Sequence, residues 1–163
     1  MEKVELNKDV KLSQHFLLGE LCKTSVKTAD GNIPSHVAIE NLKNLCENWL
    51  EELRENYNLI YEGVGDCKGD EPIIITSGYR SPEVNKAVGG APTSNHLTGC
   101  AVDIRCVGIE QALRYACILL DIADGTKRDY DELFIERSKQ GRYWVHFAVR
   151  PKENRRKTAF IQT

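Results

Sequence analysis

The sequence predicts an α+β fold in which helices pack against an antiparallel sheet. Two long segments repeat apolar residues at the three-and-four spacing of an amphipathic helix, and four short segments have the β-branched or alternating pattern of strands. The chain has 163 residues, 41% of them hydrophobic, which is enough for one core but too little for two ordinary domains. We therefore expect one domain over residues 1–163.

The first third of the chain predicts an arm followed by a long helix. Residues 1–33 are weakly periodic, and we expect them to lie on the domain as an N-terminal arm. A helix is expected over about 35–56, followed by a glycine-rich acidic loop. The apolar residues that define this helix are Leu42, Leu45, Cys46, Trp49, Leu50 and Leu53.

The rest of the chain alternates strands with shorter helices. Ser81 and Pro82 form a helix start that predicts a short helix to about Val88, and a second amphipathic helix is expected over about 109–123. The predicted strands are IIITSGY after Pro72, CAVDIRCV, ELFIE and RYWVHFAV, and the last two are joined as a hairpin by RSKQG. The basic end, 151–163, is expected to be solvated or frayed.

Strand alternation places two ligand-capable side chains away from the core. Successive side chains on a strand point to opposite faces, so Asp103 lies on the face opposite Val102 and Ile104. By the same rule, His146 shares a face with Trp144. Each strand therefore offers one polar ligand on its open side.

His96 completes a candidate zinc site. It ends the loop GGAPTSN, seven residues before Asp103, and can turn back over the open face of that strand. Two imidazoles and one carboxylate, from His96, Asp103 and His146, make a three-ligand set that leaves one zinc position for water. The hairpin brings Glu136 near the His146 strand, where its carboxylate can accept a proton from the attacking water.

A second ligand set stays open at this point. Thiolates suit zinc, and Cys100 and Cys106 lie close to His96 in the sequence. Alternation places both cysteines opposite Asp103, which favours the set with two histidines and one aspartate.

The segment SGYRSPEVNKAVGGAPTSNHLTGCAVDI, followed by WVHFAV, resembles the M15 family of zinc peptidases. This family contains D-Ala-D-Ala carboxypeptidases and phage endolysins, and it shares its fold with the hedgehog signalling domain. LSQHF is also similar to a segment near the start of phage-type members. The resemblance implies that His96, Asp103 and His146 bind one zinc ion.

The resemblance also implies a catalytic acid. Many members carry it three residues before the last histidine, where this chain has Tyr143. In hedgehog-like and phage-type members the acid ends the preceding strand, where Glu136 stands. Glu136 is therefore expected to be the general base, with Glu132 or Asp131 as alternatives. If none of them serves, the chain would be a zinc-containing wall-binding or signalling module without hydrolytic activity.

Four residues are expected to contact substrate. The guanidinium of Arg80 matches a carboxylate in shape, and the resemblance implies that it grips or steadies the substrate during catalysis. Tyr79 belongs to the same SGYR motif, Ser94 is expected to orient ligands, and Trp144 is expected to form a cleft wall. The implied substrate is peptidoglycan stem peptide, cut by a D,D-carboxypeptidase or an endopeptidase.

Composition narrows the partners and the location. The 22 basic and 24 acidic residues leave a net charge of −2, so the chain as a whole has no positive potential that would attract nucleic acid. No stretch approaches the roughly 18 apolar residues of a membrane helix, and MEKVELNKDVKL lacks the layout of a signal peptide. We expect a monomer that is made in the cytoplasm. Action on the cell wall after phage-type or prophage-type release and a recycling role on cytoplasmic wall fragments both stay open.

Overall fold

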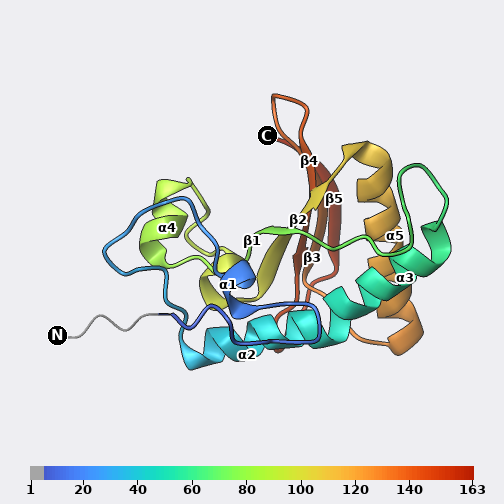
Figure 1. Cartoon of the computed structure of the whole chain (residues 1–163). Helices are drawn as coiled ribbons and strands as arrows, with labels where there is room; N and C mark the ends of the chain where they lie inside the picture. Colours follow the sequence, from blue (N-terminus) through green and yellow to red (C-terminus); the bar gives the residue numbers. More distant parts are fainter. Residues whose placement is uncertain (1–5) are drawn as a thin grey trace.

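The structure is a computed structural model that describes residues 6–163 (Figure 1). It is built around one five-stranded sheet. The strand order is β1-β2-β4-β3-β5, and β1 to β4 pair antiparallel. The α+β prediction is confirmed, but the sheet is mixed because β5 runs parallel to β3. The strands are β1 (Ile75–Ser77), β2 (Ala101–Cys106), β3 (Glu132–Arg137), β4 (Tyr143–Ala148) and β5 (Lys157–Gln162).

The helices follow the predicted order with shifted bounds. They are α1 (Leu18–Leu21), α2 (His36–Leu45), α3 (Glu51–Tyr61), α4 (Pro82–Ala87) and α5 (Gly108–Thr126). A π-helical turn, Cys46–Leu50, joins α2 to α3, so the helix expected over 35–56 is longer and has a wider central turn. Ser35 and Ser81 cap α2 and α4 through their hydroxyl groups. No helix of residues 6–163 is long and apolar enough to cross a membrane.

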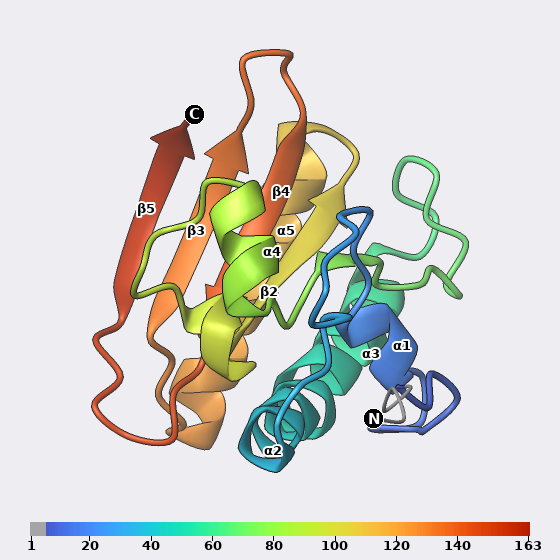
Figure 2. The same cartoon turned by 90° about the vertical axis from the view of Figure 1, so that its left-hand side faces the viewer.

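The core fills the space between one face of the sheet and the long helices. Figure 2 shows α5 behind the sheet and α4 in front of it. Trp49 of the π-helical turn packs against Phe147 of β4 with ring centroids 5.0 Å apart, and both side chains are buried. Val102 and Ile104 of β2 point into the same core, as strand alternation predicts. The opposite face of the sheet, below α4, is left for polar side chains.

The described part of the N-terminal arm packs onto this domain, while residues 1–5 lie outside the described residues. Apolar side chains of the arm join the core: Leu12, Phe16, Leu18 and Leu21. The buried Asn32 donates to the carbonyl oxygens of Cys22 and Tyr79, at 2.8 and 3.3 Å, and accepts from the amide of Ser81 at 2.7 Å. The arm is thereby fastened to the segment that follows β1.

The C-terminal segment corrects the expectation of a frayed tail. Lys157–Gln162 forms β5, and the Lys157 amide donates to the Asp131 carbonyl oxygen at 2.9 Å. The basic residues before this strand pair with acidic residues that are distant in the sequence. Arg155, for example, pairs with Asp131, 24 positions earlier. The strand is stabilised by contacts with β3, at long range in the sequence.

Candidate metal centre

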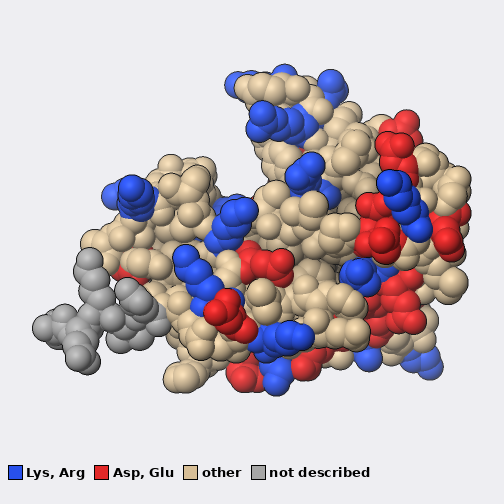
Figure 3. All heavy atoms as spheres, viewed as in Figure 1, with Lys and Arg blue, Asp and Glu red and all other residues tan. Residues whose placement is uncertain are grey.

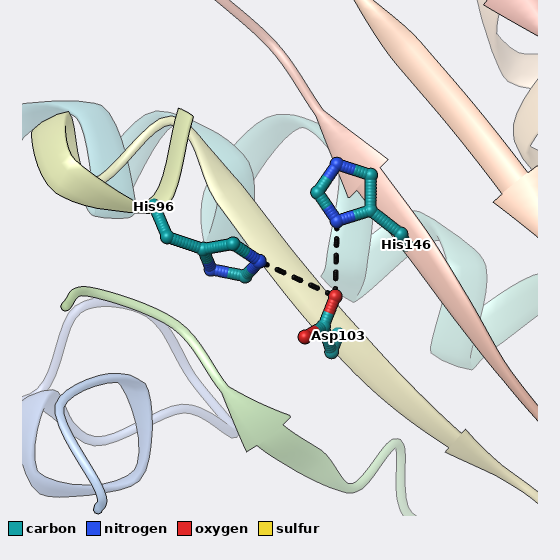
Figure 4. A group of neighbouring side chains, drawn as sticks. All are labelled: His96, Asp103 and His146. Atoms are coloured by element: carbon teal, nitrogen blue, oxygen red, sulfur yellow. Dashed lines mark hydrogen bonds and ion pairs between the residues drawn. The ribbon is translucent and has the colours of Figure 1, made fainter. Parts of the chain in front are cut away.

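The three predicted ligands converge on the open face of the sheet (Figure 4). His96 lies in the 3-10 turn Asn95–Thr98, while Asp103 of β2 and His146 of β4 are direct partners in the strand register. All three side chains are buried, and their ligand atoms lie within 4.8 Å of one another. The strand pairing thus brings together residues that are 43 positions apart in the sequence.

The spacing of the donor atoms fits a small tetrahedral ion. Asp103 Oδ1 lies 3.0 Å from His146 Nδ1 and 3.3 Å from His96 Nε2. Ligand atoms about 2.0–2.1 Å from a tetrahedral zinc ion are separated from one another by about 3.3–3.4 Å. Two imidazole nitrogens and one carboxylate oxygen are also the donor types that zinc accepts. The donor types and the two distances from Asp103 therefore fit zinc, and all three donor atoms lie within 4.8 Å of one another.

His96 is oriented by a backbone carbonyl group. Its Nδ1 lies 2.6 Å from the Gly78 carbonyl oxygen, which can only accept, so Nδ1 carries the hydrogen and Nε2 is free for a metal. Gly78 is needed for this approach, because a Cβ at this position would lie well inside 3.0 Å of the Leu21 backbone. The Tyr79 amide also donates to the Leu21 carbonyl oxygen at 2.7 Å. The glycine of SGYR thus lets the arm and the His96 turn meet.

Arg80 and Ser94 hold the other parts of the ligand set. Arg80 Nη2 donates to Asp103 Oδ2 at 3.0 Å, and its Nε donates to Ser77 Oγ at 2.9 Å. Asp103 Oδ1 is then left to face the two histidines. Ser94 Oγ accepts from the His96 amide at 3.2 Å and caps the 3-10 turn. Both residues hold candidate metal ligands in position without belonging to the cluster of three.

The electrostatics of the centre favour an ionised aspartate. Burial on its own would raise the pKa of Asp103, but the charge of His96 and hydrogen bonds from His146 and His96 hold it well below its usual range. Burial on its own would lower the pKa of His146, but its hydrogen bonds with Asp103 and Glu132 raise it to about 9. A metal binds histidine only at an unprotonated nitrogen, so metal and proton compete for His146.

A cleft of about 1030 Å³ opens onto the centre. Figure 3 shows the surface hollowed between the α4 region and the hairpin that joins β3 to β4. Glu136 and Trp144 line this cleft, as expected, and Phe134 stacks on the His146 ring with centroids 5.4 Å apart. Burial raises the pKa of Glu136, and the negative charge of Asp103 raises it further. Glu136 thus shares the cleft with the three candidate metal ligands.

Two expectations need correction. Tyr79 is 8% exposed and its side chain belongs to the hydrophobic core, so the structure gives it a packing role instead of a place in the cleft. The alternative set of His96 with Cys100 and Cys106 does not form. Within the described chain, the cluster of His96, Asp103 and His146 is the group of three whose ligand atoms converge.

Sequence reasoning missed the partners of Glu132. Glu132 Oε2 lies 2.8 Å from His146 Nε2, and Glu132 Oε1 accepts from Arg155 Nη2 at 2.8 Å. Strand alternation could have placed Glu132 near the site, because Glu132 lies on the same face of its strand as Phe134 and Glu136. No local signal marked Arg155, because its basic neighbours suggest a solvated end.

The fold and the cluster together define a candidate mononuclear metal centre on the open face of an α+β sheet. The sequence model of the family described as Peptidase M15 matches residues 14–125, well over half of the chain. The chain belongs to the Peptidase M15 family and is therefore a peptidase. The match contains His96 and Asp103, whereas His146 lies beyond it and is added by the fold. A search of curated proteins found none that matches.

Proposed function

We propose that this chain is a zinc-dependent peptidase that hydrolyses peptide bonds in bacterial peptidoglycan stem peptide. The observation that carries the proposal is the convergence of His96, Asp103 and His146 beside an open cleft, in a chain of the Peptidase M15 family. The donor spacing suits zinc, and the cleft leaves one side of the centre accessible. A metal held on only three sides is the arrangement of catalytic zinc sites.

The residues around the centre divide the work. When bound, zinc supplies Lewis-acid chemistry by lowering the pKa of water towards about 7 and polarising a carbonyl group. Glu136 accepts the proton that the attacking water loses and delivers it to the leaving amine. Arg80 holds Asp103, and Trp144 forms the wall against which the peptide lies. Gly78 keeps the hydrogen of His96 on Nδ1, away from the ligand position.

The shape of the cleft supports cleavage inside a peptide chain. A second hollow of about 590 Å³ shares Asp103 and Trp144 with the main cleft and extends towards β1 and the β3–β4 hairpin. Space on both sides of the metal ligands suits a peptide that continues past the scissile bond in both directions. Cationic side chains line both hollows and suit acidic stem peptides: Arg105 and Arg142 in one, Lys152 and Lys157 in the other.

The first test compares zinc content with hydrolysis in Glu136→Gln. We expect about one zinc per chain by mass spectrometry in wild type and variant, with kcat for a synthetic stem peptide lowered by roughly 10² or more in the variant. Glu55→Gln is the matched control, because Glu55 is exposed on α3. Full activity in Glu136→Gln would exclude it as the base. Bound zinc without hydrolysis in the wild type would indicate a non-catalytic module.

A second test separates endopeptidase from carboxypeptidase activity. One stem peptide is prepared with a free C-terminal carboxylate and with a C-terminal amide, and the products are identified by mass spectrometry. An endopeptidase cuts an internal bond in both peptides at similar rates. Cleavage of the free acid alone, with release of the last residue, would contradict internal cleavage while leaving the zinc peptidase intact.

A further inference from the structure

We infer that Glu132 and Arg155 are positioning residues for the metal centre. Glu132 orients the His146 ring through Nε2, and Arg155 fixes Glu132 in that position. The inference rests on the proposed zinc site, but it concerns residues outside the ligand set. It also assigns a role to the C-terminal segment, which lies beyond the region matched by the family.

The contact between Glu132 and His146 decides which imidazole nitrogen faces the metal. Glu132 Oε2 lies 2.8 Å from Nε2, while Nδ1 on the other side of the ring faces Asp103 Oδ1 at 3.0 Å. A neutral imidazole carries one hydrogen, so a metal bound on the Asp103 side of the ring, at Nδ1, requires that hydrogen to be on Nε2, where Glu132 accepts it. The lone pair of Nδ1 is then directed at the ligand position. Carboxylates commonly orient metal-binding histidines in this way.

Arg155 holds Glu132 from the opposite side. Its Nη2 donates to Glu132 Oε1 at 2.8 Å and to Asp131 Oδ2 at 2.6 Å, and its Nε donates to Asp131 Oδ1 at 2.8 Å. Asp131 is completely buried, so the guanidinium is anchored although the Arg155 side chain is 42% exposed. Asn95 Nδ2 adds bonds to Asp131 Oδ2 at 2.8 Å and Glu132 Oε1 at 3.1 Å.

These contacts separate the roles of the two glutamates on β3. Both oxygens of Glu132 are occupied, one by His146 and the other by Arg155 and Asn95. Glu136 lies four residues further along the strand, on the same face, and lines the cleft. Glu132 therefore acts on the metal through His146, and the proton transfer is left to Glu136.

The arginine test uses zinc affinity as its readout. We measure the dissociation constant for zinc by competition with a chromophoric chelator in wild type, Arg155→Ala and Arg156→Ala. Arg156 is a matched control, because it is 39% exposed and pairs with Asp124 and Asp129, at 2.8 and 3.1 Å, without contacting Glu132. Loss of a direct partner of a ligand weakens zinc binding by about 10–100-fold, so we expect Arg155→Ala, which frees that partner, to weaken binding towards the lower end of this range and Arg156→Ala to leave it unchanged. Equal zinc affinities in the two variants would overturn the role of Arg155.

The glutamate test follows the tautomer of His146. Nitrogen NMR of the zinc-loaded protein should show the hydrogen on Nε2, and a hydrogen on Nδ1 would overturn the inference. Glu132→Gln keeps an oxygen for His146 but changes the atom that faces Arg155, so its zinc affinity should fall less than in Glu132→Ala. Loss of hydrolysis in Glu132→Gln with unchanged zinc affinity would make Glu132 the base instead. A wild type that binds no zinc would overturn the proposed function together with this inference.

Discussion

Gly78→Ala tests how closely the arm must approach the metal centre. The nearest atoms to an added Cβ are the O, C and Cα atoms of Leu21, all inside or close to 3.0 Å, and backbone cannot move aside as a flexible side chain can. Overpacking costs about 1–3 kcal/mol, and loss of the bond from the Tyr79 amide to Leu21 adds about 1 kcal/mol. The unfolding free energy should therefore fall by about 2–4 kcal/mol, equivalent to about 4–16 °C in Tm.

The assay is urea unfolding in the presence of a chelator, followed by zinc titration of the folded protein. The variant should also bind zinc more weakly, because the Gly78 carbonyl oxygen orients His96. Gly125→Ala is the control of opposite sign. Gly125 is helical with open space around its Cβ position, so alanine there should stabilise by about 0.5–1 kcal/mol. An unchanged urea midpoint for Gly78→Ala would refute the close-approach argument.

Three further predictions concern the metal and its surroundings. Zinc at a thousand times its dissociation constant should stabilise the wild type by about 4 kcal/mol, seen as a higher Tm in differential scanning fluorimetry, and should leave Asp103→Ala unchanged. Ser94→Ala removes the cap of the His96 turn, worth about 1 kcal/mol, and should weaken zinc binding about fivefold in a chelator competition. Burial on its own would raise the pKa of Asp131, but hydrogen bonds from Arg155 and Asn95 hold it well below its usual range. Its charge therefore stabilises the fold above the unfolded pKa of about 3.9 and is lost at lower pH, so the Tm difference between wild type and Asp131→Asn should narrow below about pH 4.

The convergence of the candidate metal ligands could be predicted because it depends on strand alternation. Asp103 and His146 lie on strands whose apolar residues face the core. Because side chains alternate with a period of two, the residues between them must point to the opposite face. His96 follows a loop too short to carry it far from Asp103. Glu136 and Trp144 reached the cleft for the same reason.

The supports of the ligands could not be predicted, because each depends on a contact between distant segments. The need for glycine at position 78 comes from close contact with the Leu21 backbone, which lies 57 positions earlier in the chain. In the sequence Arg155 is one of several basic residues near the end of the chain. Its partners Asp131 and Glu132, at the start of β3, are known only from the structure. The π-helical turn at 46–50 likewise leaves no mark in a sequence whose apolar spacing is helical throughout.

Each of the three candidate metal ligands is held by a group that a different part of the chain supplies. The arm contacts Gly78 and through it His96, Arg80 after β1 holds Asp103, and the C-terminal segment reaches His146 through Arg155 and Glu132. A ligand held at only one atom loses orientation when its partner moves, and metal affinity then falls without any change in the ligands themselves. Zinc binding should consequently be coupled to the packing of both ends of the chain. Local loosening of the C-terminal segment would lower zinc affinity before it exposed the core, since the Arg155 side chain is 42% exposed whereas Trp49 and Phe147 are buried.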